Sequence, residues 1–178
     1  IEDLNPTINK NRMIELSQLI LDNNLKITWK FAAGTKIETL DKNAIEIMAK
    51  AGCVYVSLSP ESGSPNILKA MKKPFNHKYG IEMVKHMKKL GITTQACFVL
   101  GFPGETDEDL QMTRNYVKEL AKAGIDEIAM FIMTPIPGSE TTKDVKGYDR
   151  LEQLTFSPSW RQDYRKLNKF RWGTYVRY

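Results

Sequence analysis

The chain has 178 residues, of which 42% are hydrophobic and 26% charged, a composition typical of a globular domain with a substantial core. No apolar run approaches the roughly 20 residues that a membrane-spanning helix needs, and no signal-peptide pattern opens the chain. The two cysteines, Cys53 and Cys97, form no CxxC pair and lie in apolar surroundings. We interpret them as small buried residues in a reducing compartment and expect a cytoplasmic protein without a membrane span.

The net charge of +5 is concentrated near the C-terminus. Residues 160–178 carry six Lys or Arg against one Asp, interleaved with aromatic residues. Such a segment can bind nucleic acid, or it can be a helix that packs on another part of the protein with its charges in water. No nucleic-acid-binding motif accompanies it, so we favour packing and expect no nucleic-acid partner.

A supersecondary unit recurs along the chain. Each copy has a helix end with basic residues, then a glycine (Gly52, Gly91 or Gly124), then a β-rich run and a polar loop. Glycine is the usual residue where a helix ends in a left-handed conformation, and Asn24 takes this place in a weaker first copy. The period of about 30 to 40 residues predicts repeated strand–helix units. The copies occupy residues 17–35, 48–64, 87–106 and 120–140.

The apolar runs predict strands over 27–33, 54–59, 93–100 and 127–133, and the amphipathic patterns predict helices over 77–90 and 107–123. The runs are nearly continuous, which favours parallel strands buried on both faces. We therefore expect an α/β fold, a parallel-stranded partial (βα) TIM-like barrel truncated at its N-terminus, because an eight-fold barrel takes about 250 residues. We assign 1–142 to this barrel core and 143–178 to a basic, aromatic helical tail.

The loops after the predicted strands hold the chemistry-bearing residues, because ligands bind at the carboxyl ends of parallel strands. In GFPGET, Gly101 and Gly104 allow close backbone approach to a ligand, although a plain turn explains them equally well. Glu61 in SPESGS can accept hydrogen bonds from ribose hydroxyls or an amino group, or it can be a solvated loop residue. We expect no catalytic role for His77 or His86.

The order and spacing of three motifs resemble the radical S-adenosylmethionine superfamily, in particular the branch associated with a cobalamin-binding domain. The resemblance covers about residues 1–140, and FRWGTYVRY in the tail is similar to the end of that catalytic domain. The motifs are AGCVYVSLSPESGSPNILKAMKKP (51–74), KKLGITTQACFVLGFPGETDED (88–109) and TPIPGSE (134–140).

The resemblance implies a partial six-stranded barrel and an enzyme that cleaves S-adenosylmethionine reductively at a [4Fe–4S] cluster to give a 5′-deoxyadenosyl radical. It implies a small-molecule substrate and admits cobalamin-dependent methyl transfer. The cofactors of the full-length protein would then be S-adenosylmethionine, the cluster and, for methyl transfer, cobalamin. In the family a CxxxCxxC loop after the first strand holds the cluster.

The resemblance also implies which residues contact S-adenosylmethionine. Glu2 and Asp3 correspond to the end of the second strand, near the methionine amino group. Glu61 and Ser62 correspond to the end of the fourth strand, near the ribose or the methionyl group. The sequence identifies no catalytic residue.

Further cofactor contacts are implied at the fifth and sixth strands and at two basic positions. The loop beside adenine comprises Val99, Leu100, Gly101, Pro103 and Gly104. The rim after the sixth strand comprises Thr134, Pro135, Pro137 and Gly138. Lys36 and Lys73 stand where the family often has basic residues.

The chain departs from the family pattern in two places. CxxxCxxC is absent, so the chain supplies no metal ligand, and its fourth-strand loop reads LSPES where LGxES is commoner. We therefore expect a fragment whose partner is the missing N-terminal part of the same protein, and which is inactive alone. Two alternatives remain: a degenerate, non-enzymatic barrel that binds a protein or nucleic acid, and a conventional barrel enzyme with acid–base chemistry.

Overall fold

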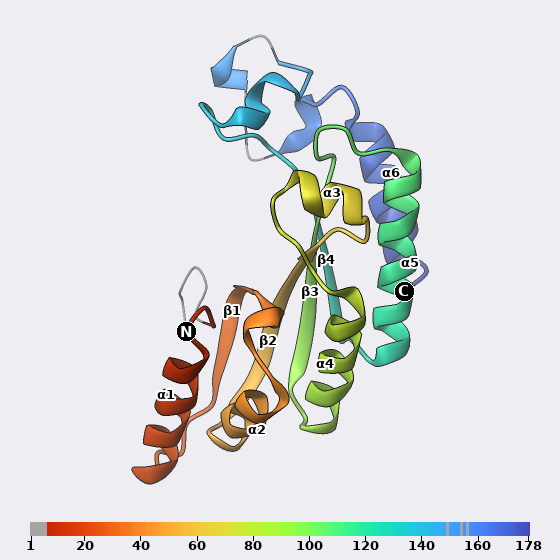
Figure 1. The fold of residues 1–178 in the computed structure, drawn as a ribbon. Coiled ribbons are helices and arrows are strands. Elements are labelled where there is room, and N and C mark those ends of the chain that lie inside the picture. Colours follow the sequence, from red (N-terminus) through yellow and green to blue (C-terminus); the bar gives the residue numbers. More distant parts are fainter. Residues whose placement is uncertain (1–6, 149, 154, 156) are drawn as a thin grey trace.

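Four parallel strands form the centre of the fold (Figure 1). The computed structural model describes residues 7–148, 150–153, 155 and 157–178. Neighbouring strands in the sheet are also consecutive in the chain, in the order β1-β2-β3-β4, and each pair is parallel. This winding is the one that builds a (βα) barrel, so the expected partial barrel is confirmed. The strands are β1 (Trp29–Thr35), β2 (Cys53–Glu61), β3 (Thr93–Leu100) and β4 (Glu127–Ile132).

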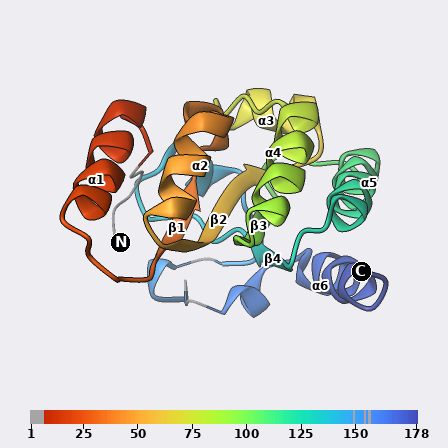
Figure 2. The same ribbon diagram turned by 90° about the horizontal axis from the view of Figure 1, so that it is seen from below.

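Helices connect the strands and lie on one side of the sheet, where α1, α2, α4 and α5 form an arc (Figure 2). Asp41, Ser64 and Thr106 are N-caps that each accept a backbone N–H, and Thr106 with Asp109 forms a capping box. The helices are α1 (Lys10–Asp22), α2 (Lys42–Lys50), α3 (Pro65–Ala70), α4 (His77–Lys89), α5 (Asp107–Ala123) and α6 (Tyr164–Tyr175). Within the described residues no helix is long and apolar enough to cross a bilayer.

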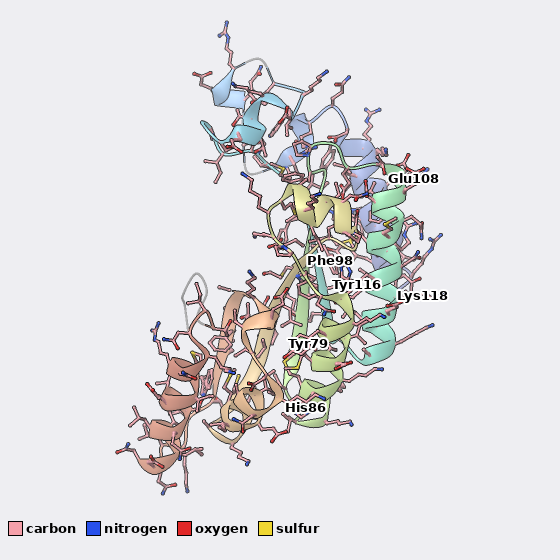
Figure 3. The ribbon with its side chains drawn as sticks, in the orientation of Figure 1. Tyr79, His86, Phe98, Glu108, Tyr116 and Lys118 are labelled. Carbon is pink, nitrogen blue, oxygen red and sulfur yellow. The ribbon has the colours of Figure 1, made fainter. Side chains whose placement is uncertain are left out.

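The hydrophobic core lies between this arc and the sheet. Phe98 on β3 and Tyr116 on α5 meet there with their ring centroids 6.1 Å apart (Figure 3). The strand residues that face the helices are buried and apolar, whereas the residues between them face the other way and are more exposed. The core side chains of the strands are Trp29, Phe31, Cys53, Val56, Leu58, Ala96, Phe98, Leu100, Met130 and Ile132.

The opposite, inner face differs from the expectation that both faces are buried. Lys30 and Glu127 are exposed there, Tyr55 and Gln95 are half-buried, and Phe131 keeps 57% of its surface. The prediction of two buried faces was wrong because it took the runs as continuous, whereas small and polar residues alternate in them with large apolar ones.

The tail packs on the barrel of this chain. Between β4 and α6 the described residues include three short 3₁₀ turns, at Glu140–Lys143, Leu151–Gln153 and Pro158–Trp160. Helix α6 then lies beside α5 and β4. The hydroxyl of Tyr175 accepts the Met130 N–H of β4 at 2.7 Å, and Arg114 of α5 stacks over the Phe170 ring at 4.3 Å. The aromatic residues of the tail thus cover the edge strand β4.

Arg161 fixes the tail to the ends of two strands. Its side chain is 6% exposed and donates to the carbonyl oxygens of Gly101 (2.9 Å) and Met133 (2.6 Å), which follow β3 and β4. It also forms a bidentate pair with Asp163 and thereby lowers the pKa of that carboxyl. The loop after β3 is therefore held by the tail.

Glu105 holds the same loop from its other side. One carboxyl oxygen accepts the Gly101 N–H at 2.6 Å, and the second oxygen is buried without a partner among the described residues. Burial raises the pKa of Glu105 to about 7, against an opposing effect of the Gly101 N–H. Near neutral pH this buried carboxyl is therefore half protonated.

We predict that Glu105 makes stability fall as the pH rises through 7. The folded state binds the Glu105 proton more tightly than the unfolded state, where the pKa has its ordinary value of 4.5. The protonated carboxyl therefore contributes its full stabilisation below pH 4.5, and this stabilisation is lost as the pH rises to 7. Urea unfolding of the wild type and Glu105→Gln over a pH series measures this. Relative to the variant, the wild type loses up to about 3 kcal/mol across this range.

Glu119→Gln on the exposed side of α5 is the matched control and should follow the wild type. Parallel pH profiles for the wild type and Glu105→Gln would show that Glu105 ionises normally and would contradict the prediction.

Candidate functional site

The carboxyl ends of all four strands lie at one edge of the sheet, the edge beside α3 in Figure 1. The strand ends and the loops that follow them carry every predicted cofactor contact that the structure describes. Glu2 and Asp3 lie outside the described residues. Of the remaining predicted residues, some line one of two cavities and the others line neither.

The first cavity, which we call the β1–β2 pocket, has a volume of about 190 Å³ and lies where β1 and β2 end. It combines two carboxylates, two lysines and one aromatic ring. It therefore offers both signs of charge within one small space, which suits a ligand that carries an ammonium and a carboxylate. Its lining residues are Gly34, Lys36, Glu38, Ser59, Glu61, Lys73, Pro74 and Phe75.

Glu61 has an unusual backbone conformation for its type. Its φ is 61°, in the left-handed region that disfavours side chains with a Cβ, and the pairing of β2 with β3 shifts register just before it. Its carboxylate accepts from Lys73 at 2.7 Å, and its side chain is 12% exposed. The bend at the end of β2 therefore directs a carboxylate into the pocket.

A buried polar network holds this bend. The Ser62 hydroxyl is bonded to that of Thr113 on α5 (3.2 Å), and the Thr113 hydroxyl accepts the Gly63 N–H (2.9 Å). The Ser64 hydroxyl donates to Asp109, which also belongs to the α5 capping box. The side chain of Ser62, a predicted contact, is fully buried and turned toward α5. It supports the loop and does not line the pocket.

Glu38 is a pocket residue that the sequence reasoning missed. Both of its carboxylate oxygens are buried and have no hydrogen-bond partner among the described residues. An unpartnered buried carboxylate is costly, so its presence in a pocket points to a donor supplied by a ligand. Its closeness to Lys36 after a strand-ending Gly-Thr was the available signal in the sequence.

The second cavity, of about 300 Å³, lies between the loop after β3 and the tail. Gly101, Pro103 and Gly104 line it together with Glu105 and Arg161. Gly101 has φ 77°, and a Cβ there would meet the Leu167 side chain at 2.5 Å. Glycine is thus required by the close approach of the tail. These predicted residues do not share a cavity with Glu61.

The other predicted residues line neither of these cavities. Val99 is half-buried on the inner face, whereas Leu100 is fully buried on the helix face. After β4 the exposure varies: Thr134 is half-buried, Pro135 buried, and Pro137 and Gly138 exposed. Both histidines lie outside the cavity at Glu61: His77 contacts the Ser62 carbonyl and His86 lies beside Glu46.

Below the pocket, five side chains form a hydrogen-bonded cluster on the inner face, which we call the polar layer. Ser57 and Cys97 donate to Gln95 Oε1 at 2.9 and 3.3 Å, and Gln95 Nε2 donates to Glu127 at 3.0 Å. Tyr55 donates to the same oxygen of Glu127 at 2.9 Å. Tyr55 on β2 thus reaches across β3 to β4, so the inner face is concave.

Burial keeps the thiols and the phenol of these strands neutral. It raises the pKa of Tyr55 to about 12, with a further contribution from the hydrogen bond to Glu127, and it raises the pKa of Cys97. Cys53 at the start of β2 is buried, and its pKa is raised to about 12 for the same reason. Neither cysteine is a thiolate at neutral pH.

An iron–sulfur cluster does not fit the residues that the structure describes. Among them, no group of three or more Cys, His, Asp or Glu side chains is placed to hold a metal ion. Cys53 and Cys97 lie on different strands and remain protonated. Within the described residues, therefore, no side chains are placed to hold the cluster.

Comparison with known proteins gives three kinds of match. The family model of the radical SAM superfamily matches residues 3–117. An uncharacterized methyltransferase of Pyrococcus horikoshii is 32% identical over 156 residues, which cover 88% of this chain and 32% of that protein. Cytidylyl-2-hydroxyethylphosphonate methyltransferase of Streptomyces wedmorensis is 28% identical over 171 residues, 91% of this chain and 31% of that protein. The chain spans about a third of the length of these relatives.

Solved structures share the fold at low identity. Coproporphyrinogen III oxidase of Escherichia coli, a radical SAM enzyme, has a TM-score of 0.66 at 16% identity, over 96% of this chain and 38% of that one. The radical S-adenosylmethionine methyltransferase TsrM of Kitasatospora setae has a TM-score of 0.53 at 18% identity, over 68% of this chain and 23% of that one.

The matched family model covers most of the barrel described above, including β1 to β3 and the loop after β3. The resemblance read from the motifs is thereby confirmed. The chain belongs to the radical SAM superfamily of enzymes.

Proposed function

We propose that this chain is the S-adenosylmethionine-binding part of a radical SAM methyltransferase or methylthiotransferase. The observation that carries the proposal is the unpartnered, buried carboxylate of Glu38 in a pocket at the strand ends. Superfamily membership and the methyltransferase names of the relatives support it. Membership in this superfamily argues against both a non-enzymatic barrel and a conventional acid–base barrel enzyme.

The β1–β2 pocket fits the methionyl group of S-adenosylmethionine, which carries an ammonium and a carboxylate. In the proposed complex Glu38 accepts hydrogen bonds from the ammonium, which satisfies its two free oxygens. Lys36 binds the carboxylate, while Lys73 remains paired with Glu61 at 2.7 Å. In this complex every buried charge of the pocket and of the ligand has a partner.

Glu61 is the proposed contact for the next part of the ligand, the ribose. Gly34 also lines the pocket, but a Cβ there would lie 1.8 Å from the Ser59 hydroxyl oxygen, so Ser59 already fills the space beside Gly34. In the proposed complex the Glu61 carboxylate accepts hydrogen bonds from the ribose hydroxyls. Ser62 acts only through the loop that it supports.

For adenine, we propose contacts with Val99 and with the rim at Thr134 and Pro135. The Gly101 carbonyl and N–H are already engaged by Arg161 and Glu105, so Gly101 positions the loop and does not bind the base through these groups. Pro103, Gly104, Pro137 and Gly138 then shape the surrounding rim.

Radical SAM enzymes cleave S-adenosylmethionine reductively at a [4Fe–4S] cluster to give a 5′-deoxyadenosyl radical, and we propose this reaction for the parent protein. Since the described residues do not hold the cluster, its cysteines would come from another part of that protein, the proposed partner of this chain. Solved structures of two structural relatives, TsrM and OxsB, contain bound cobalamin, which supports cobalamin as a further cofactor. A cytoplasmic location stays a prediction.

The test of the proposed reaction compares the full-length parent protein with residues 1–178. After anaerobic cluster reconstitution and reduction, the parent should release 5′-deoxyadenosine from S-adenosylmethionine, and the isolated chain should release none. Liquid chromatography measures the product. Release by the isolated chain, or a clustered parent that releases none, would overturn the proposal.

The Glu38 contact is tested by binding rather than turnover. In the full-length protein, Glu38→Gln should weaken S-adenosylhomocysteine, which keeps the ammonium, at least about tenfold, because a charged hydrogen bond is lost. Calorimetry should show unchanged affinity for 5′-methylthioadenosine, which lacks the amino-acid group. Glu119→Gln is the matched control, and equal losses for both ligands would contradict the assignment.

A further inference from the structure

The inner face of the sheet is unusually polar for parallel strands. The interiors of (βα)₈ barrels are filled by bulky branched side chains, and parallel strands are apolar on both faces. Here the helix face follows that rule, but the inner face carries the polar layer instead. Tight packing cannot explain hydroxyl, amide, thiol and carboxylate groups drawn from three strands.

The polar layer leaves one donor and one acceptor unused. Gln95 Oε1 accepts from Ser57 and Cys97, while one Gln95 amide hydrogen goes to Glu127. The second amide hydrogen and the second Glu127 oxygen have no partner in the described part of the chain. Because the two groups are bonded to each other at 3.0 Å, the unused donor and acceptor are neighbours.

The surrounding side chains fix this pattern. The Tyr55 phenol and the Cys97 thiol are protonated, so each acts as a donor within the layer. Ser57 and Cys97 occupy the oxygen of Gln95, which orients its amide with the nitrogen toward Glu127. The layer therefore presents a set arrangement: an N–H donor beside a carboxylate oxygen.

The polar layer and the β1–β2 pocket lie at different positions along β2. Ser57 and Glu61 are four residues apart on β2, which corresponds to about 13 Å along a strand. A register shift between Leu58 and Glu61 interrupts the regular alternation of faces there. Burial raises the pKa of the Cys97 thiol and the charge of Glu61 raises it further, so the pocket carboxylate acts on the polar layer. A molecule held on the concave face can touch the layer at one end while its other end lies near the ribose site.

We propose that Gln95 and Glu127 form the recognition site for the far end of the substrate, and that this end carries an N–H donor next to a carbonyl or imine acceptor. A carboxamide, a lactam edge or an amidine meets this requirement. The substrate nitrogen donates to Glu127, and its acceptor receives the free amide hydrogen of Gln95. The inference rests on the proposed function, because it takes the bound molecule to be the substrate.

The test needs neither cluster nor S-adenosylmethionine. The ¹⁵N-labelled chain is titrated with benzamide, and the Gln95 side-chain amide is followed by NMR. We expect a saturable shift, with at least about fivefold weaker binding of N,N-dimethylbenzamide, which lacks the donor, and of benzoate, which lacks it and is repelled by Glu127.

A charge-reversal pair separates recognition from structural effects. Glu127→Lys replaces the acceptor by a donor and should reverse the preference, so that benzoate binds more tightly than benzamide. Glu119→Lys makes the same charge change on exposed α5 and should keep the wild-type preference. A response that does not saturate, equal responses to the three ligands, or an unreversed preference would overturn the proposal. If the parent protein released no 5′-deoxyadenosine but the preference for benzamide held, the proposed radical reaction would be refuted and the recognition site would stand.

Discussion

Helices cover only one face of the four-stranded parallel sheet, and this asymmetry determines what each face can do. The apolar residues of the strands turn toward α2, α4 and α5, where they form the core. The residues between them do not pack against these helices, and they carry polar groups on a concave surface. Parallel winding also brings all the loops that follow the strands to one edge. The β1–β2 pocket at this edge and the polar layer below it are thus two levels of one side of the sheet.

Contacts from α5 and from the tail, which do not line the β1–β2 pocket, hold the loops at this edge. Thr113 and Asp109 of α5 hold the bend that carries Glu61, and Arg161 of the tail binds carbonyls after β3 and β4. Rigid support of this kind allows Glu61 to keep a left-handed backbone conformation. The basic tail therefore contributes structure to the site, with its aromatic residues over the edge of β4.

The sequence predicted the architecture well because local signals define it. Apolar runs predicted β1 to β4, and amphipathic patterns predicted α4 and α5. Glycine at helix ends revealed the repeat, and Gly52 and Gly124 indeed have positive φ. These features depend on neighbours a few residues away, which is what a pattern can report.

Side-chain direction and distant contacts were beyond such patterns. Ser62 and Leu100 were placed among the cofactor contacts, yet both are fully buried and turned away from the inner face. Glu38 gave no periodic signal, and its importance comes from missing partners that only coordinates reveal. The role of Arg161 depends on backbone carbonyls far away in sequence, so no motif announces it. Family resemblance located the edge of the sheet, and geometry then distinguished its residues.

The most direct test of this account is a crystal structure of the full-length parent protein with S-adenosylmethionine bound. The account predicts the methionyl nitrogen within about 3 Å of a Glu38 carboxylate oxygen, at the ends of β1 and β2. It also predicts that the nucleoside follows the inner face toward Val99. A ligand seated in the cavity beside the tail, with Glu38 still unpartnered, would contradict it.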